Sequence, residues 1–221
     1  MCALGKTDEG LLVRPHDARQ LYVLAHGAGT GMRHHFLAQA ADVFAGRGIA
    51  TYRYEFPYMQ AGKSRPDSPG VAEAAVRAAV VAAAHRAAEL PLIAGGKSFG
   101  GRMTSQAQAR EPLPGVRGLV FLGFPLHPPG RPGTVRAEHL TSVDVPMLFL
   151  QGTRDEFAQL ELLQQVVTGL GDRATLHLVE EGDHSFNVPK RAGKTEADVM
   201  NELAAAFSDW VAARVSLQSS L

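Results

Sequence analysis

The stretch Leu92-Ile93-Ala94-Gly95-Gly96-Lys97-Ser98-Phe99-Gly100-Gly101-Arg102 decides the fold. An apolar run enters it, glycines crowd its middle, and a helix-competent segment leaves it. Gly96, Ser98 and Gly100 form the pattern Gly-x-Ser-x-Gly, which in a strand–turn–helix context builds a sharp turn that exposes one serine hydroxyl. The flanking positions need glycine because strand and helix pack closely around a strained serine backbone. The alternative interpretation is a glycine-rich loop whose serine only caps the helix.

Strand-length and helix-length segments alternate on both sides of this stretch. Runs such as QLYVLA (20–25) are continuously apolar, which suits parallel strands covered on both faces. Strands are expected at 11–14, 20–25, 49–56, 92–95, 116–124, 146–151 and 174–180, and helices at 33–47, 71–90, 99–110, 157–169 and 195–214. The alternation predicts one domain over residues 1–221, an α/β fold with a mostly parallel, doubly wound sheet and helices on both faces.

Composition narrows the class of protein. The 221 residues are 45% hydrophobic and 20% charged, as in an ordinary soluble globular protein. The formal net charge of +0 gives no electrostatic argument for nucleic acid or an anionic membrane. The single cysteine, Cys2, excludes an internal disulfide and favours a reducing compartment. No apolar run approaches the roughly 18 residues that span a bilayer, and no signal-peptide core is present, so we expect a cytoplasmic protein.

Three polar loops follow strands of the predicted sheet. The strand 92–95 leads to Ser98, the strand ending at Gln151 leads to Asp155, and the strand 174–180 leads to His184. The carboxyl ends of parallel strands lie at one edge of a sheet, where chemistry gathers. We therefore expect a serine, an acid and a histidine to meet there.

These residue types suit nucleophilic catalysis. A serine hydroxyl is a weak nucleophile near neutral pH and needs a base within hydrogen-bond reach. His184 is the candidate base, and Asp155 is the candidate acid that orients and stabilises its imidazole. Glu156 and Asp183 are alternatives to Asp155.

The other histidines are weaker candidates for the base. His177 falls inside a predicted strand, and His85 inside the alanine-rich helix. His34 and His35, in the first turns of a helix, are expected at most to line a pocket, and His26 is expected to be structural.

An oxyanion hole needs two backbone N–H groups aimed at the developing negative charge. Phe99 follows the serine and supplies one. The other is expected from the loop His26-Gly27-Ala28-Gly29, at Ala28. The alternative for this loop is a tight turn without a catalytic role.

The tripeptide Gly-Lys-Ser also suggests a phosphate-binding loop, and it occurs at 62–64 as well as 96–98. That loop requires a glycine five positions before its second glycine, where this chain has Pro57 and Pro91. No dinucleotide-binding glycine pattern, His-Glu-x-x-His or Cys-x-x-Cys is present either. The sequence therefore predicts neither a cofactor nor a metal.

Several motifs together resemble the α/β-hydrolase fold, and more narrowly a small dienelactone-hydrolase-like subfamily. That subfamily includes the hydrolase-like domain of a subunit of a histone-acetyltransferase complex. The motifs span roughly residues 20–210 and are HGAG (26–29), YEFPYM (54–59), GGKSFGGRM (95–103), FPLHPPG (124–130), QGTRD (151–155) and GDHSF (182–186).

The resemblance implies Ser98 as nucleophile, Asp155 as acid and His184 as base. True dienelactone hydrolases have cysteine where this chain has Ser98, so their substrate is not carried over. The expected function is a serine hydrolase acting on an ester or thioester of a small acyl group, with a small molecule as partner. The alternative is a binding or scaffold module that has lost turnover, and acyl transfer or lyase chemistry also fits the fold.

The chain between the strands 116–124 and 146–151 is too short for a full helical cap domain, so we expect an open pocket. Residues 125–140 are expected to line it, and Tyr54, Phe56, Tyr58 and Met59 either line it or pack in the core. Lys97 is expected to be solvated, and Arg102 to pair within its helix. The oligomeric state leaves no signal in the sequence.

Overall fold

A seven-stranded sheet in the order β1-β3-β2-β4-β5-β6-β7 organises the computed structural model, which describes residues 10–215. Its strands are β1 (Leu11–Val13), β2 (Gln20–Ala25), β3 (Ile49–Tyr54), β4 (Leu92–Lys97), β5 (Val116–Leu122), β6 (Met147–Gly152) and β7 (Ala174–Val179). The edge strand β1 runs antiparallel to β3, and the pairings from β3 to β7 are parallel. The predicted mostly parallel sheet is confirmed, and Cys2 lies outside the described residues.

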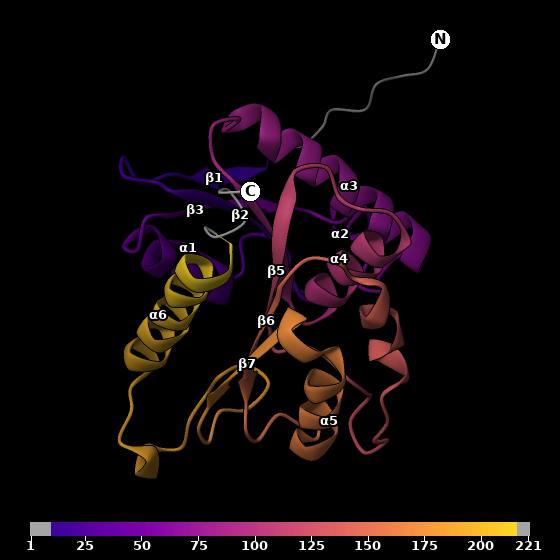
Figure 1. The fold of residues 1–221 in the computed structure, drawn as a ribbon, viewed down its shortest axis with the longest axis vertical. Helices are drawn as coiled ribbons and strands as arrows, with labels where there is room; N and C mark the ends of the chain where they lie inside the picture. The colour runs from indigo at the N-terminus through magenta and orange to yellow at the C-terminus, as the bar shows by residue number, and fades with distance from the viewer. Residues whose placement is uncertain (1–9, 216–221) are drawn as a thin grey trace.

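Helices cover both faces of this sheet. Figure 1 shows α1 and α6 on one side and α3, α4 and α5 on the other. The helices are α1 (His35–Ala45), α2 (Pro57–Gln60), α3 (Pro69–Arg86), α4 (Phe99–Arg110), α5 (Leu160–Leu170) and α6 (Glu196–Arg214), with short 3₁₀ segments η1 (Val135–Ser142), η2 (Gly171–Arg173) and η3 (Lys190–Ala192). Between β5 and β6 the chain forms η1 alone, so a large cap domain is absent from the described residues, as predicted.

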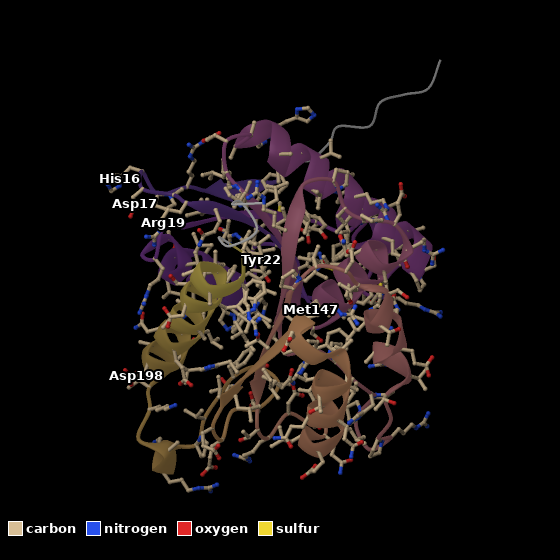
Figure 2. The ribbon with its side chains drawn as sticks, in the orientation of Figure 1. His16, Asp17, Arg19, Tyr22, Met147 and Asp198 are labelled. Carbon is tan, nitrogen blue, oxygen red and sulfur yellow. The ribbon has the colours of Figure 1, made fainter. Side chains whose placement is uncertain are left out.

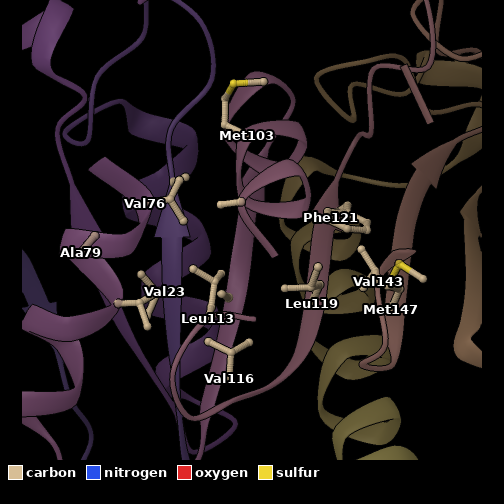
Figure 3. Packing of buried hydrophobic residues seen from close by; sticks show 14 of the residues in the cluster. Val23, Val76, Ala79, Met103, Leu113, Val116, Leu119, Phe121, Val143 and Met147 are labelled. Carbon is tan, nitrogen blue, oxygen red and sulfur yellow. The ribbon is translucent and has the colours of Figure 1, made fainter. Parts of the chain in front are cut away.

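Successive residues of each strand enter different cores because side chains alternate across a sheet. On the α1 and α6 side, Tyr22 packs edge-on against Phe207, with ring centroids 5.0 Å apart, and its hydroxyl donates to the Val120 carbonyl. Figure 2 shows Tyr22 beside α6. On the opposite side, Val76 of α3 lies beside Val23 of β2, and Met103 of α4 belongs to the same core as Phe121 of β5 (Figure 3). Burial on both faces explains why the central strands are apolar throughout.

Two helices differ from their predicted bounds by three or more residues at one end. The helix expected at 157–169 begins at Leu160, because the Phe157 N–H donates instead to the Asp155 carboxylate in a turn. The helix expected at 71–90 ends at Arg86, because Ala87 leaves the helical region (φ −152°, ψ 61°) and its carbonyl accepts the Leu90 N–H in a turn.

Three strands differ from their predicted bounds by two residues, and the others by one at most. β4 runs two residues further than expected, because Gly96 and Lys97 still pair with β5. β5 ends at Leu122, where Gly123 turns to a φ of +70°. β3 ends at Tyr54, and the short helix α2 starts at Pro57, which is a favoured first helical residue.

The helix α4 lies unusually close to β2. A Cβ atom built on Gly100 would lie 2.5 Å from the His26 carbonyl oxygen and 2.7 Å from the Ala25 Cβ atom. A Cβ atom on Gly96 would lie 2.4 Å from the Ala25 carbonyl oxygen. Glycine at both positions therefore lets strand, turn and helix approach one another.

We predict that Gly100→Ala lowers the free energy of unfolding by about 2–3 kcal/mol, because the methyl group overpacks against backbone. Urea denaturation followed by circular dichroism measures the loss. Gly70→Ala is the matched control: Gly70 is likewise the second residue of its helix, and a Cβ atom built on it would have no neighbour within 4 Å. Equal stabilities of the two variants would contradict the close approach.

Candidate active site

Ser98 occupies a strained turn between β4 and α4. Its backbone has φ 49° and ψ −114°, a region that non-glycine residues rarely adopt. Its side chain makes no capping hydrogen bond to the helix, and its Oγ atom lies 2.8 Å from Nε2 of His184 instead. The interpretation of Ser98 as a simple helix cap is therefore wrong. Backbone strain of this kind is characteristic of functional positions.

His184 links Ser98 to Asp155. Its Nδ1 atom lies 2.7 Å from Oδ2 of Asp155, whose carboxylate is buried. The other carboxylate oxygen accepts the Phe157 N–H at 2.8 Å, and the Phe157 ring lies against the imidazole with centroids 4.3 Å apart. With the proton on Nδ1 donated to Asp155, Nε2 is free to accept the serine proton. The turns after β4, β6 and β7 thus bring together the three residues that the sequence singled out.

The alternative acids are engaged elsewhere or exposed. The Asp183 carboxylate accepts the N–H groups of Ser185 and Asn187, at 2.8 and 2.9 Å, and so closes its own turn. Glu156 is exposed.

His26 is structural, as expected. It is fully buried, its Nε2 atom accepts the Phe56 N–H, and burial lowers the pKa of its imidazole.

The two expected oxyanion donors lie on either side of the serine. Among residues 10–215, neither the Ala28 nor the Phe99 N–H has a hydrogen-bond acceptor. The next amide, that of Gly29, donates to the Tyr58 hydroxyl at 2.8 Å, which holds the loop. Two unused amides beside a serine hydroxyl suit the stabilisation of a tetrahedral oxyanion.

A cavity of about 450 Å³ opens at Ser98 and His184. It extends between the first turn of α1 and the first turn of α6. Its buried lining side chains are apolar, namely Phe36, Leu37, Phe186, Val199 and Met200. Its polar lining side chains are Thr30, His34, His35, Lys97, Ser98, His184, Ser185, Asn187 and Glu196. Burial, followed by the nearby charges of His35 and Lys97, lowers the pKa of His34, which favours its neutral form.

One expectation about this cavity is wrong, and of the two alternatives for the aromatic residues after β3, core packing is observed. Residues 125–140 do not line it. Their first part instead supports the Asp155 turn, because His127 accepts the Gln159 N–H and donates its own backbone N–H to Phe157. The aromatic residues Tyr54, Phe56 and Tyr58 pack in the core beside Phe99, and Met59 packs against that core.

The two cations next to the serine also differ from expectation. Lys97 is not solvated: desolvation lowers its pKa to about 8, and its Nζ atom donates to the His184 carbonyl at 2.5 Å. Arg102 does not pair within its helix. Its buried Nε atom has no hydrogen-bond partner among the described residues, and burial followed by the charge of Arg136 lowers its pKa.

Sequence reasoning missed Gln151, the residue that holds Asp155 from behind. Its side chain is fully buried, its Nε2 donates to Asp155 Oδ2, and its Oε1 accepts the Phe124 N–H at 2.8 Å. The available signal was a polar residue at the end of an otherwise apolar strand, MLFLQ (147–151).

Other chemistries find little support in the part of the chain that the structure describes. No three His, Cys, Asp or Glu side chains there are grouped closely enough to hold a metal ion. Within residues 10–215, every helix is too short or too polar to cross a bilayer.

Comparisons with known proteins agree with this architecture. A family model described as an alpha/beta hydrolase domain matches residues 18–212. The chain is similar to a dienelactone hydrolase from Anabaena variabilis, with 20% identity, 93% of this chain and 91% of that chain covered, and a TM-score of 0.71. It is also similar to an alpha-beta serine hydrolase homologue from Coxiella burnetii, with 16% identity, 90% of each chain covered and a TM-score of 0.70. A third structure is an α/β serine hydrolase without a lid from Xanthomonas campestris, with 20% identity, coverage of 90% and 87%, and a TM-score of 0.69. Structural similarity at sequence identities this low establishes the fold alone.

We predict that Gln151→Leu lowers the free energy of unfolding by about 2–4 kcal/mol, because it leaves the buried Phe124 N–H without an acceptor and Asp155 without a donor. Chemical denaturation measures the change. Gln164→Leu, on the exposed face of α5, is the matched control and should shift stability by less than about 0.5 kcal/mol. A Gln151→Leu variant as stable as this control would refute the supporting role.

Proposed function

Because the chain belongs to the alpha/beta hydrolase domain family, we propose that it is a serine hydrolase that cleaves an ester or thioester of a small acyl group. One observation carries the proposal: a continuous hydrogen-bonded row from Ser98 Oγ through His184 to Asp155, with distances of 2.8 and 2.7 Å. Such a row activates a hydroxyl that is otherwise a weak nucleophile. The strained backbone of Ser98 favours the same conclusion.

The proposed reaction has two halves. Ser98 Oγ attacks the acyl carbon while its proton passes to Nε2 of His184, and Asp155 stabilises the resulting imidazolium. The imidazolium then returns the proton to the leaving alcohol or thiol, which departs and leaves an acyl-enzyme. Water attacks the acyl-enzyme in the same way, with His184 again as base, and releases the acid and free Ser98. The amides of Ala28 and Phe99 are the proposed donors to the oxyanion in each half.

The cavity supports a small substrate. Its volume of about 450 Å³ lies near the lower end of the range for small-molecule sites, and its buried lining side chains are apolar. An uncharged aliphatic or aromatic acyl group fits this lining better than a charged one, since burial of an unpaired charge is costly.

We predict that Ser98→Ala abolishes labelling by a fluorophosphonate probe and lowers the hydrolysis of p-nitrophenyl esters and acyl thioesters at least about a thousandfold. Ser64→Ala is the matched control, because Ser64 ends the other Gly-Lys-Ser tripeptide on an exposed loop. Equal labelling and turnover of wild type and Ser98→Ala would refute the assignment of the nucleophile. A wild type that is neither labelled nor active would instead support the catalytically silent module.

We predict that Asp155→Asn lowers kcat for the same esters by about 10³–10⁴-fold, because the imidazole loses the acceptor that fixes its tautomer. Asp183→Asn tests the neighbouring carboxylate. The amide oxygen of that replacement still accepts the N–H groups of its turn, so kcat should fall no more than a few-fold. The reverse ranking of the two variants would move the acid from Asp155 to Asp183.

A further inference from the structure

Lys97 is half-buried and lines the cavity of the candidate active site together with Ser98 and His184. It is the last residue of β4 and directly precedes Ser98. Its ammonium group lies 5.9 Å from the centroid of the Phe36 ring and 5.6 Å from that of Phe186. These two rings stack at 9° to each other, one on α1 and one in the loop that carries His184. Lys97 of β4 therefore contacts aromatic rings from two elements that line the cavity.

The ammonium group also holds the histidine itself. Nζ donates to the backbone carbonyl of His184 at 2.5 Å. Gly123, at the end of β5, leaves the space for this contact: a Cβ atom there would lie 3.0 Å from Nζ and 3.3 Å from the His184 carbonyl oxygen. A charge-assisted hydrogen bond to a carbonyl is stronger than a neutral one. The contact thus fixes the backbone from which the imidazole projects.

No carboxylate among the described residues forms an ion pair with Lys97. The titratable and charged groups that face it are His34 and His35 of α1, Asp155 after β6, Asp183 and His184 after β7, and Glu196 of α6. The Asp155 and Asp183 charges favour its protonation, but burial outweighs them. Lys97 is half-buried, and a partly desolvated cation without an ion-pair partner lowers stability. Packing alone would be served better by methionine, which suits a space between aromatic rings.

We propose that Lys97 is a positioning residue, whose ammonium group holds the His184 backbone where the imidazole reaches Ser98. This inference rests on the proposed function, because it concerns the base of that reaction. The ammonium group lowers stability, so its removal should lower activity without lowering stability. Replacing a residue with only a structural role would lower activity and stability together.

The test compares Lys97→Met with Lys63→Met, the same change in the exposed Gly-Lys-Ser tripeptide. We expect Lys97→Met to lower both kcat for a p-nitrophenyl ester and the rate of fluorophosphonate labelling at least about tenfold, with KM within about twofold of wild type. Its melting temperature should equal or exceed that of wild type. Lys63→Met should match wild type in all four measurements.

The pH dependence of wild type supplies a second readout, with Lys97→Met as the reference. The pKa of Lys97 is about 8, well below its ordinary value of 10.5. The labelling rate should therefore fall toward that of Lys97→Met as the pH rises through 8 and the ammonium loses its proton. Between about pH 8 and 10.5 the unfolded chain binds the proton that the folded chain has lost, so the stability of wild type should rise relative to Lys97→Met.

The outcomes separate the two proposals. Wild type that is not labelled at any pH would overturn the proposed function and this inference with it. Wild type that is labelled, together with Lys97→Met labelled at the same rate, would overturn only the positioning role. Loss of activity together with loss of melting temperature, with an unchanged pH profile, would also overturn it in favour of a purely structural lysine.

Discussion

The close approach of α4 to β2 and β4 is the constraint on which the candidate site depends. Gly96 and Gly100 bring these backbones within distances that any side chain would prevent. A chain that leaves a strand and enters a helix at this separation has one residue in which to turn. That residue is Ser98, and the turn forces its positive φ. The position of the hydroxyl is thus tied to backbone packing as well as to the hydrogen bond with His184.

The neighbouring strands β6 and β7 supply the other two residues of the candidate site, and further side chains support these residues from behind. Gly152 and Val179, which pair at the ends of β6 and β7, lead into the turns of Asp155 and His184. Behind them, Gln151 ties the acid to the backbone of Phe124, and His127 ties the same loop to the turn before α5. The acid is therefore held by Gln151 of β6, which is itself tied to the loop after β5. Each contact is modest, but together they leave the carboxylate little freedom to rotate.

Much of this arrangement follows from the sequence because it depends on local pattern. Apolar runs located the parallel strands, and strand ends located Ser98, Asp155 and His184. The properties that escaped prediction depend on distant contacts. Whether Lys97 is solvated depends on the space beside Gly123 and on two rings from other elements. Whether residues 125–140 line the cavity depends on the path of a proline-rich loop. The observed bounds of α3 and α5 differ from the predicted ones because a turn after Ala87 and a side-chain hydrogen bond to Asp155 replace helical hydrogen bonds.

The hydrogen bond from Gly29 to the Tyr58 hydroxyl has a consequence for the loop that contains Ala28. Tyr58 is almost fully buried and contacts Phe56 and Phe99, so it belongs to the same aromatic cluster as the residue that follows the serine. Both backbone segments that carry the proposed oxyanion donors are thus anchored to one cluster of aromatic rings. Donors held in this way would need little reorganisation in the proposed reaction. The close packing of these rings therefore restricts the motion of the loop that contains Ala28 and of the first residue of α4.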